Sequence, residues 1–132
     1  MASLTRAAQA LSDETRLRIL NVLTVQECCV CEVMQALNIS QTRASRNLKI
    51  LSDAGFLSMR TDGLYSLYSL RNDTAGGFHA DLLEAVRKAL GSSALAREDA
   101  ARLRKARRIG PGCLPQEKVS CIRDSSEAVT PS

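Results

Sequence analysis

ISQTRASRNLKILSDAGFL, residues 39–57, has the pattern of a capped amphipathic helix. Ser40 supplies a capping hydroxyl ahead of it, and Gly55 suits the left-handed position that follows a helix end. At 100° per residue the apolar positions fall on one side: Ala44, Leu48 and Leu51. This spacing predicts a helix from Gln41 to about Asp53 that packs inward along its apolar side.

The opposite side of this helix is polar and basic, and it has no acid before Asp53. Such side chains bond base edges and phosphates, and recognition helices contact bases mainly near their N-termini. We therefore predict a DNA-reading helix, with a plain solvated helix face as the alternative. The candidate contact residues are Gln41, Thr42, Arg43, Ser45, Arg46 and Lys49.

The flanking segments predict the rest of a small fold. At Ser12 a capping hydroxyl followed by two acids indicates a helix start. Asp62-Gly63 indicates a two-residue hairpin loop in which both residues have positive φ. A first helix is expected at 3–11 and a second one begins at Ser12. Further helices are expected at 30–37, 41–53, 78–90 and 95–109, and two strands at 56–60 and 64–70. Their order predicts a mainly α (α+β) winged helix-turn-helix, with a two-stranded β-hairpin as the wing.

In the wing, Arg60 is a candidate for contact with a phosphate or the minor groove, and a solvated strand end is the alternative interpretation. Phosphate contacts of this kind would make the affinity for DNA fall steeply with salt.

The composition is that of one small domain with an aliphatic core. The chain has 132 residues, a formal net charge of +4 and 3% aromatic residues. It has no apolar run of ~18 residues that could span a membrane, and its N-terminus lacks a signal-peptide pattern, so we expect a cytoplasmic protein. Thiols stay reduced there, and the five cysteines do not indicate a disulfide framework.

We divide the chain at residue 92. Residues 1–92 are expected to form the winged helix-turn-helix DNA-binding domain. Residues 93–132 are expected to form a basic helical extension and a tail, with little order after Gly110 because the tail is rich in Ser, Pro and charge.

Three cysteines, Cys28, Cys29 and Cys31, lie just ahead of the DNA-reading helix. In a regular helix Cys28 and Cys31 share a face, whereas Cys29 and Cys31 point in roughly opposite directions. One ion held by all three therefore needs a non-helical or distorted first turn, which is feasible where a helix begins. Such a distortion would tilt the helix that supports the DNA-reading helix, and would thereby connect ion binding to loss of DNA binding.

The chemistry of the cluster favours As(III) or Sb(III), because three soft thiolates without a histidine suit a trigonal ion. Zinc normally takes four ligands, often including histidine, and the chain has one histidine, His79. Two alternatives stay open. Cys28 and Cys31 could form a redox-sensing pair, or the cysteines could be small buried hydrophobes.

An enzyme, such as a small thiol reductase, is a distant alternative. A phosphate-cradling Cys-x5-Arg loop needs an arginine six residues after a cysteine. Those positions hold Met34, Gln35, Leu37, Val119 and Glu127. We therefore predict no catalytic residues. A metal-storage protein would leave the basic outer side of the 41–53 helix without a purpose.

The chain resembles the ArsR/SmtB family of metal-sensing winged-helix repressors over roughly residues 5–90. The resemblance rests on LSDETRLRIL (11–20), ECCVCEV (27–33), ISQTRASRNLKILSDAGFL (39–57) and RTDGLYSLYSL (60–70). It implies a homodimer, joined through residues 3–11 and 78–90, that occupies operator DNA and releases it when metal binds. Residues 1–92 would then be both the DNA-binding and the dimerisation domain.

ECCVCEV is similar to the arsenite-type box of this family, in which Cys-Val-Cys is followed by a third Cys three residues on. Cys29 and Cys31 match that box, Met34 stands at the third position, and Cys28 is expected to restore the set to three. The resemblance implies an As(III)- or Sb(III)-responsive repressor of an arsenical resistance operon.

Other sensors of the family match less well. Its cadmium, lead and zinc sensors add cysteines near the N-terminus, and this chain has none before Cys28. Its zinc site needs paired histidines and acids, which His79 and Asp81 cannot supply. A cadmium, lead or zinc sensor and a thiol-redox sensor of the same fold stay as alternatives, and we expect Cys113 and Cys121 to be idle.

Overall fold

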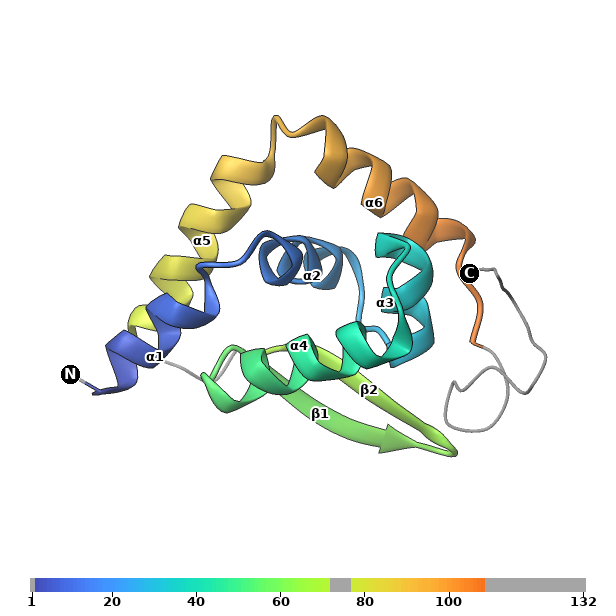
Figure 1. The fold of residues 1–132 in the computed structure, drawn as a ribbon, viewed down its shortest axis with the longest axis horizontal. Helices are drawn as coiled ribbons and strands as arrows, with labels where there is room; N and C mark the ends of the chain where they lie inside the picture. Colours follow the sequence, from blue (N-terminus) through green and yellow to red (C-terminus); the bar gives the residue numbers. More distant parts are fainter. Residues whose placement is uncertain (1, 72–76, 109–132) are drawn as a thin grey trace.

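The computed structural model describes residues 2–71 and 77–108, which form six helices and one antiparallel hairpin (Figure 1). The elements are α1 (Ala2–Ala10), α2 (Glu14–Val25), α3 (Val30–Leu37), α4 (Gln41–Asp53), β1 (Leu57–Asp62), β2 (Tyr65–Leu70), α5 (Phe78–Leu90) and α6 (Ala94–Lys105). This order confirms the predicted winged helix-turn-helix, with α3 and α4 as the helix pair and β1–β2 as the wing.

Helix α2 lies at the centre of the fold. Helices α3 and α4 pack against it, the hairpin extends along α4, and α5 and α6 form an arch over it (Figure 1). The division expected at residue 92 falls in the turn between α5 and α6, and the tail expected after Gly110 lies outside the described residues. Within residues 2–71 and 77–108, no helix is long and apolar enough to cross a membrane.

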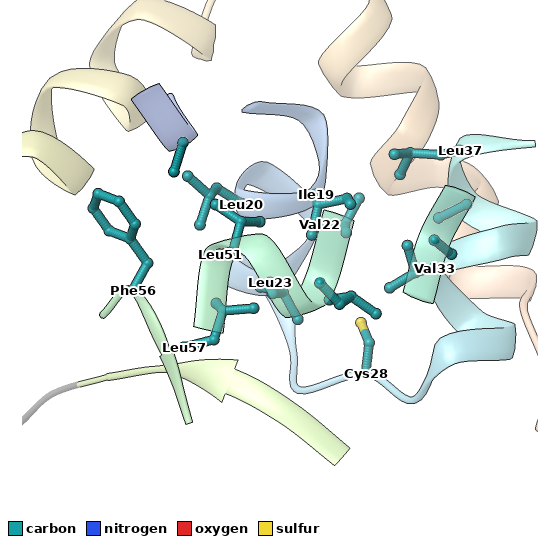
Figure 2. Close-up of a cluster of buried hydrophobic side chains, with 14 of the residues drawn as sticks. Ile19, Leu20, Val22, Leu23, Cys28, Val33, Leu37, Leu51, Phe56 and Leu57 are labelled. Carbon is teal, nitrogen blue, oxygen red and sulfur yellow. The ribbon is translucent and has the colours of Figure 1, made fainter. Parts of the chain in front are cut away.

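The core forms where α2, α3 and α4 meet, and it is aliphatic apart from Phe56 and the thiol of Cys28 (Figure 2). Fully buried side chains contribute from each element: Ile19, Leu20 and Val22 from α2, Val33 from α3, Leu48 and Leu51 from α4, and Phe56 beside β1. Burying one such side chain contributes roughly 1.5–3 kcal/mol. This cluster therefore holds α4 against α2 and α3.

The chain leaves α4 through Gly55, whose φ of +96° confirms the predicted left-handed position. A Cβ atom at Gly55 would lie 2.7 Å from Nε2 of His79. That ring nitrogen also lies 2.8 Å from the carbonyl oxygen of Ala54, and the ring packs against Phe56 and Phe78. The chain's one histidine therefore joins the start of α5 to the end of α4.

The predicted start of α2 is wrong by one residue. Asp13, rather than Ser12, caps the helix, because its carboxylate accepts the backbone N–H of Arg16 at 3.1 Å. The Ser12 hydroxyl instead donates to the carbonyl of Gln9 at 2.6 Å. A carboxylate and a hydroxyl are both good caps. The Ser12 hydroxyl bonds the end of α1, and the Asp13 carboxylate therefore caps α2.

The predicted hairpin loop is also wrong by one residue. Asp62 pairs with Tyr65, so the two loop residues are Gly63 and Leu64 rather than Asp62 and Gly63. Gly63 has a φ of +63°, and it alone has positive φ in this hairpin. A two-residue loop with glycine first and an ordinary residue second matches the type II′ pattern.

Helix α6 packs on α2 and α3 and is anchored by one buried acid. Asp99 is 0% exposed and accepts hydrogen bonds from Arg18 Nε at 2.8 Å, Arg18 Nη2 at 2.9 Å and Arg102 Nη2 at 2.6 Å. The hydrogen bond to Asp99 raises the pKa of Arg18. Both arginines also donate to carbonyls at the end of α3, those of Leu37 and Ala36. Asp99 thus fastens α6 across the C-terminal end of α3.

Candidate thiol site and nucleic-acid interface

Helix α4 carries the predicted DNA-reading residues on its outer side. The Ser40 hydroxyl accepts the Arg43 backbone N–H at 3.2 Å and so caps the helix, as predicted. Burial of Ala44, Leu48 and Leu51 turns the opposite face outward. Of the six candidates, Ser45 is half-buried and the others are exposed: Gln41, Thr42, Arg43, Arg46 and Lys49.

Three polar side chains that were not among the predicted site residues help to hold α4 in place: Asn47, Arg16 and Thr15. Asn47 is buried on the inward side of α4 and accepts Arg16 Nη1 at 2.9 Å, while Arg16 Nε donates to the Ala10 carbonyl at 2.7 Å. Arg43 Nη2 donates to the Thr15 hydroxyl at 2.7 Å. A polar residue in the apolar stripe of α4 was the available signal for Asn47. The network joins α1, α2 and α4, and it therefore sets the orientation of the helix.

The predicted wing contact, Arg60, is paired with an acid. Its Nη2 and Nε donate to the two carboxylate oxygens of Glu27 at 2.7 and 3.1 Å. These hydrogen bonds lower the pKa of Glu27. The side chain of Arg60 is exposed, so the pair sits at the surface between the wing and the cysteine segment.

Cys28 joins that segment to the wing through its backbone. Its N–H donates to the Tyr68 carbonyl at 3.0 Å, and the Tyr68 N–H donates back at 2.8 Å. The Cys28 thiol points into the core among aliphatic side chains (Figure 2) and donates to the Gln26 carbonyl at 3.4 Å. Burial raises the pKa of this thiol to about 12, with a further contribution from the Glu32 carboxylate.

Cys29 and Cys31 form a separate buried pair, with their sulfurs 3.1 Å apart. They meet because Cys29 is the extended residue before α3, with φ −89° and ψ 173°, and Cys31 lies in the first turn. The non-helical backbone at Cys29 agrees with the predicted departure from a regular helix, although it brings together two of the three thiols. The Cys29 N–H donates to Glu32 Oε1 at 2.9 Å, which fixes the turn. Apolar side chains surround the pair: Leu67, Met34 and Tyr65.

The backbone that follows α6 docks beside this pair. The Arg107 carbonyl accepts Gln35 Nε2 at 2.6 Å and the Cys31 thiol at 3.6 Å. The Arg107 N–H donates to Gln35 Oε1 at 3.1 Å, so one amide side chain bonds both backbone polar groups of Arg107. Nothing in the sequence pattern predicted this contact between residues more than 70 positions apart.

Arg108 adds a second attachment. It donates to Glu32 Oε1 at 3.4 Å, and its guanidinium lies 5.5 Å from the ring centre of Tyr65. The same carboxylate oxygen thus contacts both the start of α3 at Cys29 and the chain after α6.

Of the predicted thiol set, the fold brings Cys29 and Cys31 together and directs Cys28 elsewhere. Within the part of the chain that the structure covers, no three His, Cys, Asp or Glu side chains are grouped so that they could hold an ion. Cys113 and Cys121 lie outside the described residues. The three-cysteine ligand set therefore stays a prediction.

Comparison with known proteins gives the same family from sequence and from structure. Residues 13–58 match the family model of bacterial regulatory proteins of the arsR family. An arsenical resistance operon repressor of Bacillus subtilis is 33% identical over 76 residues, which cover 57% of this chain and 72% of that protein. A homolog of a cadmium resistance transcriptional regulatory protein, from Staphylococcus aureus, is 38% identical over 66 residues, which cover 49% of this chain and 54% of that protein.

A solved structure supports the fold. It is the solution structure of a homodimeric winged helix-turn-helix DNA-binding domain from Mycobacterium bovis, described as a possible ArsR-family transcriptional regulator. It aligns with a TM-score of 0.59 and 26% identity, over 70% of this chain and 82% of that one. The chain therefore belongs to the arsR family of bacterial regulatory proteins, which are DNA-binding winged-helix regulators rather than enzymes.

Proposed function

We propose that this regulator is an As(III)- or Sb(III)-responsive repressor of an arsenical resistance operon. A homodimer binds operator DNA through α4 and the wing, and releases it when the ion binds at the cysteines before α3. The observation that carries the proposal is the pair of sulfurs of Cys29 and Cys31, 3.1 Å apart.

The pair fits a soft ion. With ion–sulfur distances of about 2.3 Å, as for zinc, two sulfurs on one ion lie at most about 4.6 Å apart. The observed separation falls within that limit. Thiolates select soft ions, and the positive end of α3 favours negative charge at this place.

Binding of arsenous acid is an exchange of ligands without oxidation or reduction. For each As–S bond that forms, one As–O bond breaks, and the cysteine proton leaves with the hydroxide as water. The apolar walls of the pair, Leu67 and Met34 among them, limit the access of the water that would reverse the exchange.

Similarity to an arsenical resistance operon repressor supports this choice of inducer. Similarity to a cadmium resistance regulator makes Cd(II) the competing inducer, although the chain spans about half the length of that relative.

The DNA-binding part of the proposal rests on the outer side of α4. Gln41, Thr42 and Arg43 stand at its N-terminal end, where recognition helices meet base edges, and Ser45, Arg46 and Lys49 follow along the helix. Arg60 on β1 would also contact DNA once its ion pair with Glu27 is broken.

The dimer would form through residues 3–11 and 78–90. Helix α5 is amphipathic, yet none of its side chains is buried within one chain. Its large apolar residues, such as Leu82, Leu83 and Val86, are half-buried, and Leu4 on α1 is 44% exposed. A second copy would cover these faces, and the similar domain from Mycobacterium bovis is homodimeric.

Release of DNA would follow from the position of the pair next to the wing. Cys28, which precedes Cys29, is bridged to Tyr68 on β2, and Glu27 is bonded to Arg60 on β1. A ligand that moves the backbone at Cys29 therefore acts on both wing strands. A coupling free energy of about 1–3 kcal/mol is sufficient for substantial release.

The test is fluorescence anisotropy with labelled DNA from upstream of the regulated operon. As(III) should release the wild-type protein, and Cys29→Ser and Cys31→Ser should bind DNA but resist As(III). Additions of Cd(II), Zn(II) and peroxide compare the other inducers. Release by one of these but not by As(III), or unchanged As(III) release from both serine variants, would overturn the proposal.

A further inference from the structure

The end of α6 carries basic side chains that neither the fold nor the thiol site uses. Residues 100–108 include five basic residues and no acid. Arg102 bonds Asp99, and Arg108 bonds Glu32. Three exposed cations remain, and within residues 2–71 and 77–108 no carboxylate pairs with any of them. We call these three residues the α6 basic end: Arg104, Lys105 and Arg107.

The helix dipole accounts for only part of this charge. Cations in the last turn of a helix stabilise its negative end, which suits Arg104 and Lys105. The helix ends at Lys105, however, and Arg107 lies beyond it. The backbone of Arg107 bonds Gln35, whereas its side chain is directed to solvent. A cation beyond the helix end is not explained by the dipole, so we looked for a partner outside the chain.

The α6 basic end lies close to the wing. The chain that leaves α6 runs past α3 toward the hairpin (Figure 1). The Arg108 guanidinium lies 5.5 Å from the ring centre of Tyr65, the first residue after the hairpin loop. The pKa of Glu27 is lowered mainly by the hydrogen bonds from Arg60, and the charge of Arg108 lowers it further. The basic end is therefore a neighbour of the predicted DNA contact in the wing, Arg60.

Side chains of α3 hold this segment in place. Gln35 bonds both backbone polar groups of Arg107, and Glu32 bonds the side chain of Arg108. Helix α3 directly precedes the DNA-reading helix α4, so the basic end has a defined position relative to α4. A segment that is already ordered loses less conformational entropy when it binds, and it therefore binds a charged partner more tightly than a free chain does.

We propose that the α6 basic end contacts the phosphate backbone of DNA immediately outside each operator half-site. This inference rests on the DNA-binding part of the proposed function, because α4 and the wing would bring the DNA to this side of the molecule. Lys and Arg bind phosphates whatever the base sequence. Each protomer of the proposed dimer then meets DNA through three elements. Helix α4 reads base edges, and the wing and the α6 basic end position the protein on the backbone.

Hydroxyl-radical footprinting of the full-length protein, on DNA from upstream of the regulated operon, locates the contact. The test variant combines Lys105→Ala and Arg107→Ala, and it leaves the backbone of residue 107 able to bond Gln35. The wild type should protect both half-sites and an added stretch of backbone at each outer end. The variant should protect the half-sites and lose the outer stretches. Its retained half-site protection shows that it is folded.

Salt titrations by fluorescence anisotropy measure the size of the contact. Each phosphate contact that is lost should reduce the slope of log affinity against log salt by about 0.9. On DNA extended by about one helical turn beyond each half-site, the variant should bind about fivefold more weakly than the wild type. On DNA trimmed to the half-sites, the two proteins should have equal affinity.

Two controls separate a phosphate contact from other roles. Arg97→Ala removes an exposed cation from the first turn of α6, which lies away from α4 and the wing (Figure 1), and should keep the wild-type footprint. Lys105→Arg combined with Arg107→Lys keeps both charges and should keep the outer protection.

Outer protection that is unchanged in the alanine variant, or half-site protection that is lost along with it, would overturn the proposal. An equal loss of affinity on trimmed and extended DNA would do the same. Failure of the wild type to protect any of the DNA would instead overturn the DNA-binding part of the proposed function.

Discussion

Cys28 and Tyr68 exchange two backbone hydrogen bonds, at 3.0 and 2.8 Å, which attach the segment before α3 to the outer edge of the wing strand β2. The cysteine segment is therefore joined to the wing by an isolated β-bridge. Its next residue, Cys29, is one of the two thiols that the proposed inducer binds.

This bridge predicts a local response to the inducer. We expect the Tyr68 amide to exchange slowly with deuterium in the ion-free protein, and at least tenfold faster once As(III) is bound. The Ala44 amide, bonded to the carbonyl of the capping residue Ser40 in the first turn of α4, is the control and should keep its rate. Equal exchange at Tyr68 with and without As(III) would show that the signal takes another route.

The Glu27–Arg60 pair predicts a change in DNA affinity. Glu27→Gln should raise operator affinity by about threefold, because it frees Arg60 to contact a phosphate. Arg60→Ala should lower the affinity and reduce the salt slope by about one. Binding titrations at several salt concentrations measure both effects. Glu98→Gln removes the same charge on α6, and an equal gain there would show that Glu27 acts only through net charge.

Hydrogen bonds from Arg60 lower the pKa of Glu27, so the Glu27–Arg60 pair depends on pH in a defined way. The pair is present above the ordinary glutamate pKa and is lost only as the pH falls through the lowered value. The difference in operator affinity between the wild type and Glu27→Gln should therefore stay constant from neutral pH down to the ordinary glutamate range, as binding titrations at several pH values would show.

We expect a substitution on the outer side of α4 to weaken DNA binding without lowering the stability of the fold. Arg46→Ala should weaken operator binding at least tenfold, and it should leave the free energy of unfolding within about 0.5 kcal/mol of the wild type because Arg46 is exposed. Arg97→Ala is the matched control, an exposed arginine on α6. Similar losses of operator affinity in both variants would mean that Arg46 contributes only general positive charge.

At Gly55 we expect a small substitution to lower the free energy of unfolding strongly. In Gly55→Ala the backbone must keep a φ of +96°, which costs about 1–3 kcal/mol, and the new Cβ would lie 2.7 Å from His79 Nε2. Gly91→Ala provides the comparison, because Gly91 has a φ of −60° and its added Cβ would make ordinary contacts. Urea denaturation should show a strong loss for the first variant and little change for the second.

We expect the buried Asp99 carboxylate to contribute to the stability of the protein by holding α6 against α2 and α3. Asp99→Asn removes the buried negative charge between Arg18 and Arg102 and should lower the free energy of unfolding by about 3 kcal/mol. Glu98→Gln, at the neighbouring exposed position, should change it little. A loss of stability below about 1 kcal/mol in Asp99→Asn would mean that the buried pair does not hold α6 in place.

Much of the fold could be predicted because its signals are local. The limits of α3 and α4 follow from Asn38 and Ser40, since a left-handed residue and a capping hydroxyl act on their immediate neighbours. Local signals failed where two adjacent residues could each take the same structural role. Asp13 replaced Ser12 as the cap, and the glycine of the hairpin took the first loop position instead of the second.

The thiol site could be predicted only in part, because its geometry depends on distant residues. The cysteines themselves were evident from their spacing. The inward turn of Cys28 depends on its bridge to Tyr68, 40 positions later, and the docking of Arg107 depends on Gln35. Neither contact leaves a periodic pattern in the sequence, so helical periodicity could show only that the three thiols do not converge in a regular helix, and not which two of them meet.

The contact between His79 and the end of α4 has a consequence for the operator. His79 stands in the first turn of α5 and bonds the Ala54 carbonyl, so the recognition helix and the proposed dimer helix are joined without an intervening flexible link. In a symmetric dimer, the distance between the two recognition helices would then be set by this junction. In the proposed dimer, the spacing of the two operator half-sites, normally about one turn of DNA, would therefore depend partly on the space that Gly55 leaves for the imidazole ring of His79.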